Sequence, residues 1–160
     1  MAVQDTFNGA KSGLTFMQAY LSTVGQEIGM EQALTLDTKT CQMLGKAQGM
    51  MIREQDGNKE IDTRAAAQIL GNLIEKSFGI PIEVTDESPN KTTCKVGRCP
   101  VYESAEIIGM DNKDIEAGCK AGAITFMDSA AKQLNPKLSY KLTKFRSSAD
   151  DFCEETVVME

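Results

Sequence analysis

The order of apolar and polar residues predicts two long helices at the start of the chain. Over residues 15–28 apolar side chains recur every three or four positions, which is typical of an amphipathic helix. A second apolar stripe with nearly heptad spacing covers residues 30–51, and a polar gap in it at Asp37 predicts a helix break. The polar residues 55–59 predict the turn that follows.

A third helix and a first β-hairpin come next in the predicted order. Asp62 can accept hydrogen bonds from the free N–H groups at the start of a helix, and Gly79 is suited to end it. After Gly79 the spacing changes, because apolar residues then alternate with polar ones over residues 80–86 and 92–96. Two strands joined by a polar turn are predicted here.

Two more helices and a second hairpin complete the prediction. Pro100 suits the first position of a short helix, and Asp111 can cap a longer helix that ends at Leu134. Alternation over residues 138–142 and 152–159 predicts the last two strands. The whole order predicts an α+β fold, with N-terminal helices followed by two β-hairpins that form a small antiparallel sheet with two intervening helices.

The length of the chain predicts one domain. Its 160 residues contain no linker or internal repeat, so we expect a single domain 1–160, with a helical half 1–79 and a cysteine-containing half 80–160. The first residues do not resemble a signal peptide, and no apolar run is long enough to span a bilayer. We therefore expect a cytoplasmic protein, in which five cysteines serve as thiols or metal ligands rather than disulfides.

Charge and composition narrow the classes of partner. The formal net charge is −6 and no run of Lys or Arg is present, so we expect no nucleic-acid partner and no membrane partner. A small-molecule ligand is favoured, and both a homo-oligomer and a place in a larger enzyme complex are compatible with the sequence. His is absent, so metals and nucleophiles have to rely on other side chains.

Cys99 is the strongest candidate for a reactive thiol. It directly precedes Pro100, the predicted first residue of a helix. The free N–H groups and the positive dipole end of a helix stabilise a thiolate, and Arg98 adds positive charge. These neighbours predict a lowered pKa for Cys99 and a role as nucleophile or metal ligand. Cys41, on an apolar helical stripe, is instead expected to be a packing residue.

Four cysteines of the second half could converge on one interior cavity. Cys94 and Cys153 belong to predicted strands, Cys99 to a helix start and Cys119 to the core side of the longer helix. As a set of thiolates they could bind zinc or an iron–sulfur cluster without any His. Each of them is also compatible with an ordinary packing role, and that alternative stays open.

Further residues extend this candidate site. Asp151 lies two residues before Cys153, and Glu103 follows Cys99 in the short helix, so either carboxylate could act as a general base beside a thiol. Tyr102 could donate a hydrogen bond there. A ligand pocket between the helices and the sheet would be lined by Cys119, Phe126, Met127 and Leu142.

The second half of the chain also resembles a known family. Residues 90–160 are similar to the L-2-amino-thiazoline-4-carboxylic acid hydrolase-like family, through Cys99-Pro100, Cys119, Asn135-Pro136 and Asp150-Asp151-Phe152-Cys153. More loosely, the order of elements resembles vinyl-reductase-type small-molecule-binding domains related to TRAPP trafficking subunits. The resemblance implies either ring-opening hydrolysis of a cyclic cysteine precursor or binding of a small apolar molecule. It implies these site residues: Cys99, Cys119, Asp151 and Cys153.

Three functions therefore stay open. The first is hydrolysis of a small C–N or C–S heterocycle, with Cys99 as nucleophile and Asp151 or Glu103 as general base. The second is a non-catalytic module that binds a hydrophobic ligand or serves as an accessory subunit. The third is a protein that holds zinc or an iron–sulfur cluster through its thiolates.

Overall fold

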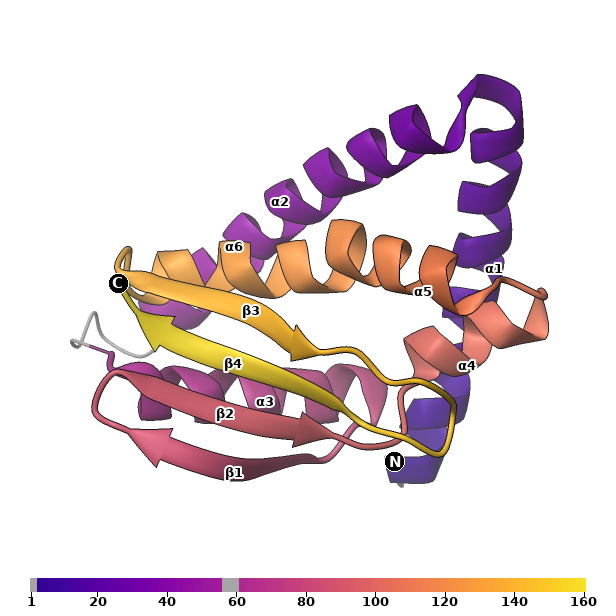
Figure 1. Cartoon of the computed structure of the whole chain (residues 1–160). Helices are drawn as coiled ribbons and strands as arrows, with labels where there is room; N and C mark the ends of the chain where they lie inside the picture. Colours follow the sequence, from indigo (N-terminus) through magenta and orange to yellow (C-terminus); the bar gives the residue numbers. More distant parts are fainter. Residues whose placement is uncertain (1–2, 56–60) are drawn as a thin grey trace.

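A computed structural model describes residues 3–55 and 61–160 of the chain (Figure 1). Along the chain the elements are α1 (Val3–Ile28), α2 (Met30–Gln55), α3 (Thr63–Phe78), β1 (Ile82–Ser88), β2 (Lys91–Val96), α4 (Pro100–Ile107), α5 (Asn112–Cys119), a π-helical segment η1 (Lys120–Ile124), α6 (Thr125–Leu134), β3 (Leu138–Lys144) and β4 (Cys153–Met159). The predicted α+β class and both predicted hairpins are confirmed.

The four strands form one antiparallel sheet in the order β1-β2-β4-β3. β2 pairs with β4, which joins the two hairpins at the centre of the sheet. In this register Cys94 lies opposite Glu155, and Val96 lies opposite Cys153. Paired residues share a face of a sheet, so both cysteines and Glu155 point to the same side.

Local sequence signals placed several element ends correctly. The Asp62 carboxylate accepts a hydrogen bond from the Ala65 N–H at 2.8 Å, and Gly79 ends α3 with a φ of 67°. That positive φ is easily adopted by glycine because it has no Cβ. Asp111 caps α5 in the same way as Asp62 caps α3, and Pro100 is the first residue of α4.

Other predicted boundaries were wrong. The first helix starts at Val3, twelve positions before the predicted start. α2 continues through Asp37 without a break, because Asp37 accepts a hydrogen bond from the Cys41 thiol one turn later (3.7 Å between sulfur and oxygen). β1 begins at Ile82, since Pro81 has no N–H to give to a strand ladder. The turn predicted at residues 55–59 lies outside the described residues, apart from Gln55.

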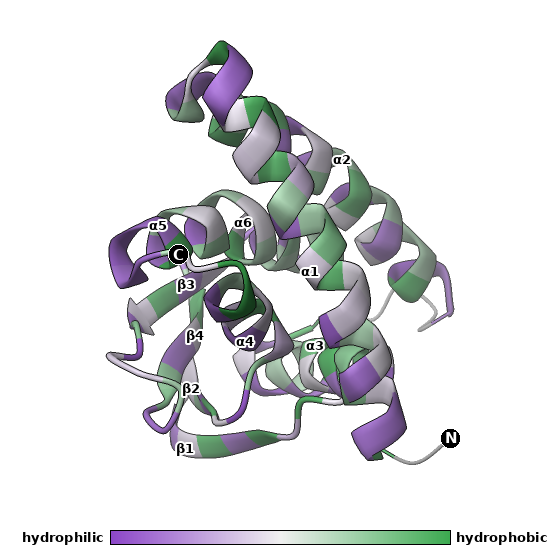
Figure 2. Ribbon diagram, turned by 90° about the vertical axis from the view of Figure 1, so that its right-hand side faces the viewer, coloured by the Kyte–Doolittle hydropathy of each residue, from purple (hydrophilic) through white to green (hydrophobic). Residues whose placement is uncertain are grey.

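The helices cover one face of the sheet in two layers (Figures 1 and 2). α3 and α6 lie against the strands, and they carry most of the buried apolar side chains with the inner face of the sheet. α2 packs on the outer side of α6, while α1 contacts α2, α3 and α4. The closed end of the α1–α2 hairpin extends beyond the other helices. Within the described residues, no helix combines the length and the hydropathy needed to cross a membrane.

α2 and α6 approach closely because two glycines of α2 face α6. A Cβ placed on Gly49 would lie 2.6 Å from the backbone oxygen of Ala130, and one on Gly45 would meet the backbone oxygen of Phe126 even more closely. Real Cβ atoms do not approach backbone oxygens to this extent. The two glycines therefore fix the face of α2 that turns inward.

Candidate functional site

The cysteines of the second half do come together around one interior region. Cys94 and Cys153 are buried on the inner face of the sheet, Cys99 is the N-cap of α4, and Cys119 is the last residue of α5. All five cysteines of the chain are free thiols. Burial raises the pKa values of Cys94, Cys99 and Cys119, and the negative charge of Glu155 adds to the rise at each of the three thiols.

Arg146 supplies a positive charge to this region, although it was not among the site residues predicted from the sequence. Its side chain is only 1% exposed, and it comes from the loop between β3 and β4. Its Nε donates to the Cys153 sulfur at 3.4 Å, and its Nη2 donates to the backbone oxygens of Val96, at 3.0 Å, and Gly97. Its Nη1 is buried without a hydrogen-bond partner among the described residues. The guanidinium thus ties the loop to the end of β2.

Glu155 is an acid on the inner face of the sheet. The Tyr140 hydroxyl donates a short hydrogen bond to its carboxylate. Burial raises the pKa of Glu155, and the Tyr140 hydrogen bond and the Arg146 charge oppose that rise. Burial, followed by the charge of Glu155 and the hydrogen bond to it, raises the pKa of Tyr140 well above its ordinary value. Together with Arg146 and the thiols, these two side chains form a polar cluster inside an otherwise apolar core.

The structure reverses the pKa direction that the sequence predicted for Cys99. Burial raises its pKa to about 11, which outweighs the helix N–H groups of Tyr102 and Val101 and the charge of Arg146. Arg98 contributes little here, because it binds Glu103 at 2.6 Å instead. At neutral pH the Cys99 thiol is therefore protonated, and it is a weak nucleophile.

The two predicted general bases are engaged elsewhere. Glu103 binds Arg98 and Lys11, and these contacts outweigh burial so that its pKa is lowered. Asp151 accepts hydrogen bonds from Lys144 at 2.8 Å and from the Ser147 N–H at 2.9 Å, and both hydrogen bonds lower the pKa of Asp151. No hydrogen bond within the described part of the chain joins either carboxylate to Cys99. Both act as structural ion pairs.

The predicted pocket residues belong mainly to the packed core. Met127 is 5% exposed, and Phe126 and Leu142 pack against the same cluster of buried side chains. Tyr102 is also buried, and its hydroxyl donates to the Asn112 side chain at 3.0 Å. The Arg146 guanidinium lies 5.2 Å from the centre of the Tyr102 ring, so Tyr102 borders the polar cluster.

The four-thiolate metal site finds no support. Among residues 3–55 and 61–160, no three His, Cys, Asp or Glu side chains are grouped so that they could hold a metal ion. Burial raises the pKa of Cys94 to about 11 and that of Cys119 well above its ordinary value. A cationic guanidinium on Cys153 also opposes the binding of a metal cation there. Neutral thiols around an arginine are a poor ligand set for zinc or an iron–sulfur cluster.

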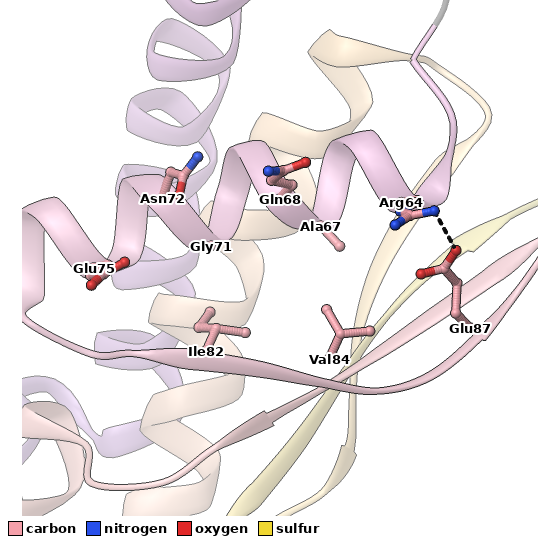
Figure 3. Close-up of a pocket in the computed structure, with 9 residues that line it drawn as sticks. All are labelled: Arg64, Ala67, Gln68, Gly71, Asn72, Glu75, Ile82, Val84 and Glu87. Atoms are coloured by element: carbon pink, nitrogen blue, oxygen red, sulfur yellow. Dashed lines mark ion pairs between the residues drawn. The ribbon is translucent and has the colours of Figure 1, made fainter.

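A shallow groove of about 320 Å³ lies instead between α3 and the edge strand β1 (Figure 3). Ile82 and Val84 of β1 point toward α3, whose facing residues Ala67 and Gly71 are too small to fill the gap. An ion pair of Arg64 with Glu87, 3.4 Å between nitrogen and oxygen, closes one end. The remaining lining is polar: Gln68, Asn72 and Glu75.

Most of the exposed large apolar side chains lie on the α1–α2 hairpin. Twelve large apolar side chains are exposed in the described part of the chain, and ten of them belong to α1 or α2. They include Phe16 at 77% exposure, Tyr20 at 65% and Met43 at 63%. The ten residues are Val3, Phe16, Met17, Tyr20, Ile28, Leu36, Met43, Leu44, Met50 and Met51, and we call them the hairpin face.

The charge state of Glu155 gives the first testable prediction. An acid whose pKa is raised in the folded state stabilises the fold most below its unfolded pKa and loses that contribution as the pH rises through the folded pKa. Glu155→Gln should therefore become more stable relative to the wild type as the pH rises from about 4 to 8. Urea denaturation at several pH values measures the difference in the free energy of unfolding.

Glu154→Gln is the matched control for this series. Glu154 is the preceding residue of β4 and lies opposite Lys95, on the outer face of the sheet. Its difference from the wild type should vary much less with pH. A difference between Glu155→Gln and the wild type that stays constant over the whole range would show that folding does not raise the pKa of Glu155.

The comparisons with known proteins support the fold alone. No protein-family model matches the chain, and no curated protein matches it in sequence. Among solved structures, a trafficking protein particle complex subunit 3 from Naegleria fowleri, covalently bound to palmitic acid, matches with a TM-score of 0.58. The match has 12% sequence identity and covers 94% of this chain and 96% of that one. This chain shares its fold with that subunit.

The likeness bears on the two resemblances seen in the sequence, and only at the level of the fold. The looser resemblance to TRAPP subunits is supported at the level of the fold. The closer resemblance, to the thiazoline-carboxylic acid hydrolase-like family through Cys99, Cys119, Asp151 and Cys153, finds no support in any comparison. The cysteine motif therefore does not identify an activity.

Proposed function

We propose that this chain is a non-catalytic accessory subunit of a larger protein assembly and that it binds its partner through the hairpin face. The observation that carries the proposal is the exposure of ten large apolar side chains on two adjacent helices. Single exposed apolar residues are common on protein surfaces, but ten of them on two adjacent helices favour an interaction site.

The shape of the molecule supports this role. The hairpin extends beyond the rest of the fold, so a partner can reach it without disturbing the sheet (Figures 1 and 2). Elsewhere in the described chain only Val84 and Ile107 are large, apolar and exposed. The neighbour with the same fold is itself named as a subunit of a complex, which agrees with a subunit role for this chain.

The chemistry of the interior argues against the hydrolase alternative. Cys99 is protonated at neutral pH because its pKa is about 11. Asp151 and Glu103 are held in ion pairs with Lys144, Arg98 and Lys11, and neither has a hydrogen bond to the thiol. A cysteine hydrolase activates its nucleophile through a hydrogen-bonded base or a lowered thiol pKa, and the described contacts of Cys99 supply neither. A reducing, cytoplasmic setting with free thiols remains our expectation for this subunit.

The size of the native particle tests the proposal. In an extract of the cells that produce the protein, the wild-type chain should elute in size-exclusion chromatography far ahead of a single chain. Met43→Glu places a charge in the middle of the hairpin face and should shift the chain to the monomer position, since a buried unpaired charge disrupts an apolar interface. Circular dichroism confirms that the variant is folded.

Val84→Glu is the matched control, because Val84 is 51% exposed but lies on β1, away from the hairpin. This variant should leave the large particle intact. Elution of the wild-type chain as a monomer, or loss of the particle by both variants alike, would contradict the proposed role of the hairpin face.

A further inference from the structure

One stripe of α2 has the spacing of a coiled-coil seam. Leu36, Thr40, Met43, Ala47 and Met50 follow one another at alternating intervals of four and three residues, and all five are exposed. Leu36 is 51% exposed, Met43 63% and Met50 54%. This alternation is the a/d pattern that places knobs against a second helix over several turns.

The seam is not used by the fold itself. Gly45 and Gly49, which face α6, occupy the side of α2 opposite to the seam in a heptad. The stripe is therefore turned away from the molecule along its whole length. Leu44 and Met51 broaden it on one flank, at 50% and 53% exposure. Three of these apolar residues are Met, whose flexible side chains adapt to the surface of a partner helix.

Basic residues line the other flank of the seam. Lys39, Lys46 and Arg53 are spaced by seven residues, and the first two directly precede the seam positions Thr40 and Ala47. Lys39 and Lys46 are exposed and form no ion pair within the described part of the chain, while Arg53 also donates to the Gln133 backbone oxygen at 3.1 Å. The net charge of the chain is −6, so this row of basic residues has the opposite sign to the chain as a whole. Residues beside a seam select partners by charge.

We propose that α2 binds an amphipathic helix of a partner protein, with an apolar three-four repeat and acidic residues on the flank that meets Lys39, Lys46 and Arg53. This inference rests on the proposed function and names the occupant of the same face. A second copy of the chain fits less well. An antiparallel pair of α2 helices would set the basic rows against each other, and a parallel pair would set them against Leu44 and Met51.

Two synthetic helical peptides test the charge rule on the intact chain. Both carry Leu at the three-four repeat, and one has Glu and the other Lys at the flanking positions. We expect the Glu peptide to bind, measured by fluorescence anisotropy at low salt, and the Lys peptide to bind roughly tenfold more weakly or not at all. The double variant Lys39→Glu/Lys46→Glu should reverse this preference.

The matched control is Lys76→Glu/Lys113→Glu, which changes the net charge equally at exposed lysines on α3 and α5. It should keep the preference for the Glu peptide. Equal binding of both peptides, unchanged by the Lys39→Glu/Lys46→Glu reversal, would overturn the acidic flank and leave the proposed function standing.

Other outcomes separate the inference from the function on which it rests. If neither peptide binds while Met43→Glu still dissociates the native particle, the face is used but its occupant is not a helix of this kind. If neither peptide binds and Met43→Glu leaves the particle intact, both proposals fail. Self-association of the purified chain in sedimentation, abolished by Met43→Glu, would make a second copy the occupant and overturn the inference.

Discussion

Gly45→Ala and Gly49→Ala should each lower the free energy of unfolding by about 2 kcal/mol. A methyl group at either position meets a backbone oxygen of α6, and overpacking of this kind typically costs about 1–3 kcal/mol. The intrinsic helix preference of alanine offsets up to about 1 kcal/mol of that loss. Thermal unfolding should detect a drop of roughly 4–8 °C in the melting temperature.

Gly13→Ala gives the opposite sign in the same experiment. Gly13 lies inside α1, and a Cβ there would have no atom within 4 Å. The substitution should stabilise the protein by about 0.5–1 kcal/mol through helix preference alone. Stabilisation by Gly45→Ala or Gly49→Ala would mean that α2 does not lie directly against α6, and the outward orientation of the seam would lose its basis.

Arg146→Met should destabilise the protein by about 3 kcal/mol or more. The substitution removes donors to the backbone oxygens of Val96 and Gly97, and each buried acceptor left without a donor costs about 1–3 kcal/mol. Arg146→Lys should recover little of the loss, because an ammonium group cannot reach the positions of a planar guanidinium fork. Urea denaturation of the three proteins measures these differences.

Arg64→Met is the matched control for this substitution. Its side chain is 73% exposed, and the surface ion pair with Glu87 is the only one it forms among residues 3–55 and 61–160, so its loss should cost less than about 1 kcal/mol. An Arg146→Met variant as stable as Arg64→Met would show that Arg146 does not hold the β3–β4 loop to the end of β2.

Much of the fold followed from local patterns in the sequence. Asp62, Pro100 and Asp111 act within three residues of their own position, so the sequence alone could place the helix starts at these points. The start of α1 was missed because residues 3–14 carry few apolar side chains. The continuity of α2 was missed because the side chain of Asp37 is satisfied inside the helix, by Cys41.

The interior cluster could be predicted only in part. Four cysteines drew attention to the right region, but the two charged members were missed. Glu154 and Glu155 are neighbours of the same residue type, so the sequence does not distinguish them. Only the register of β4 shows that Glu155 faces inward. Arg146 follows a strand in a loop, where an arginine is usually exposed. The pKa of Cys99 was predicted in the wrong direction because burial depends on tertiary packing, which a helix start does not reveal.

The hairpin face was not anticipated either, because an apolar stripe on a helix predicts burial without saying what buries it. The apolar residues of 15–28 predicted only an amphipathic helix, and in the structure Phe16 and Tyr20 are among the most exposed apolar side chains described. Exposed aromatic side chains of this kind are typical of a surface that binds a partner protein.

Methionine oxidation in the native particle and in the purified chain tests this account most directly. Met43 and Met50 are 63% and 54% exposed, so peroxide should oxidise both rapidly in the purified chain, while Met127, at 5%, reacts slowly in either state. Mass spectrometry should find Met43 and Met50 protected in the native particle. Equal oxidation of these two residues in both states would contradict the claim that the hairpin face binds a partner.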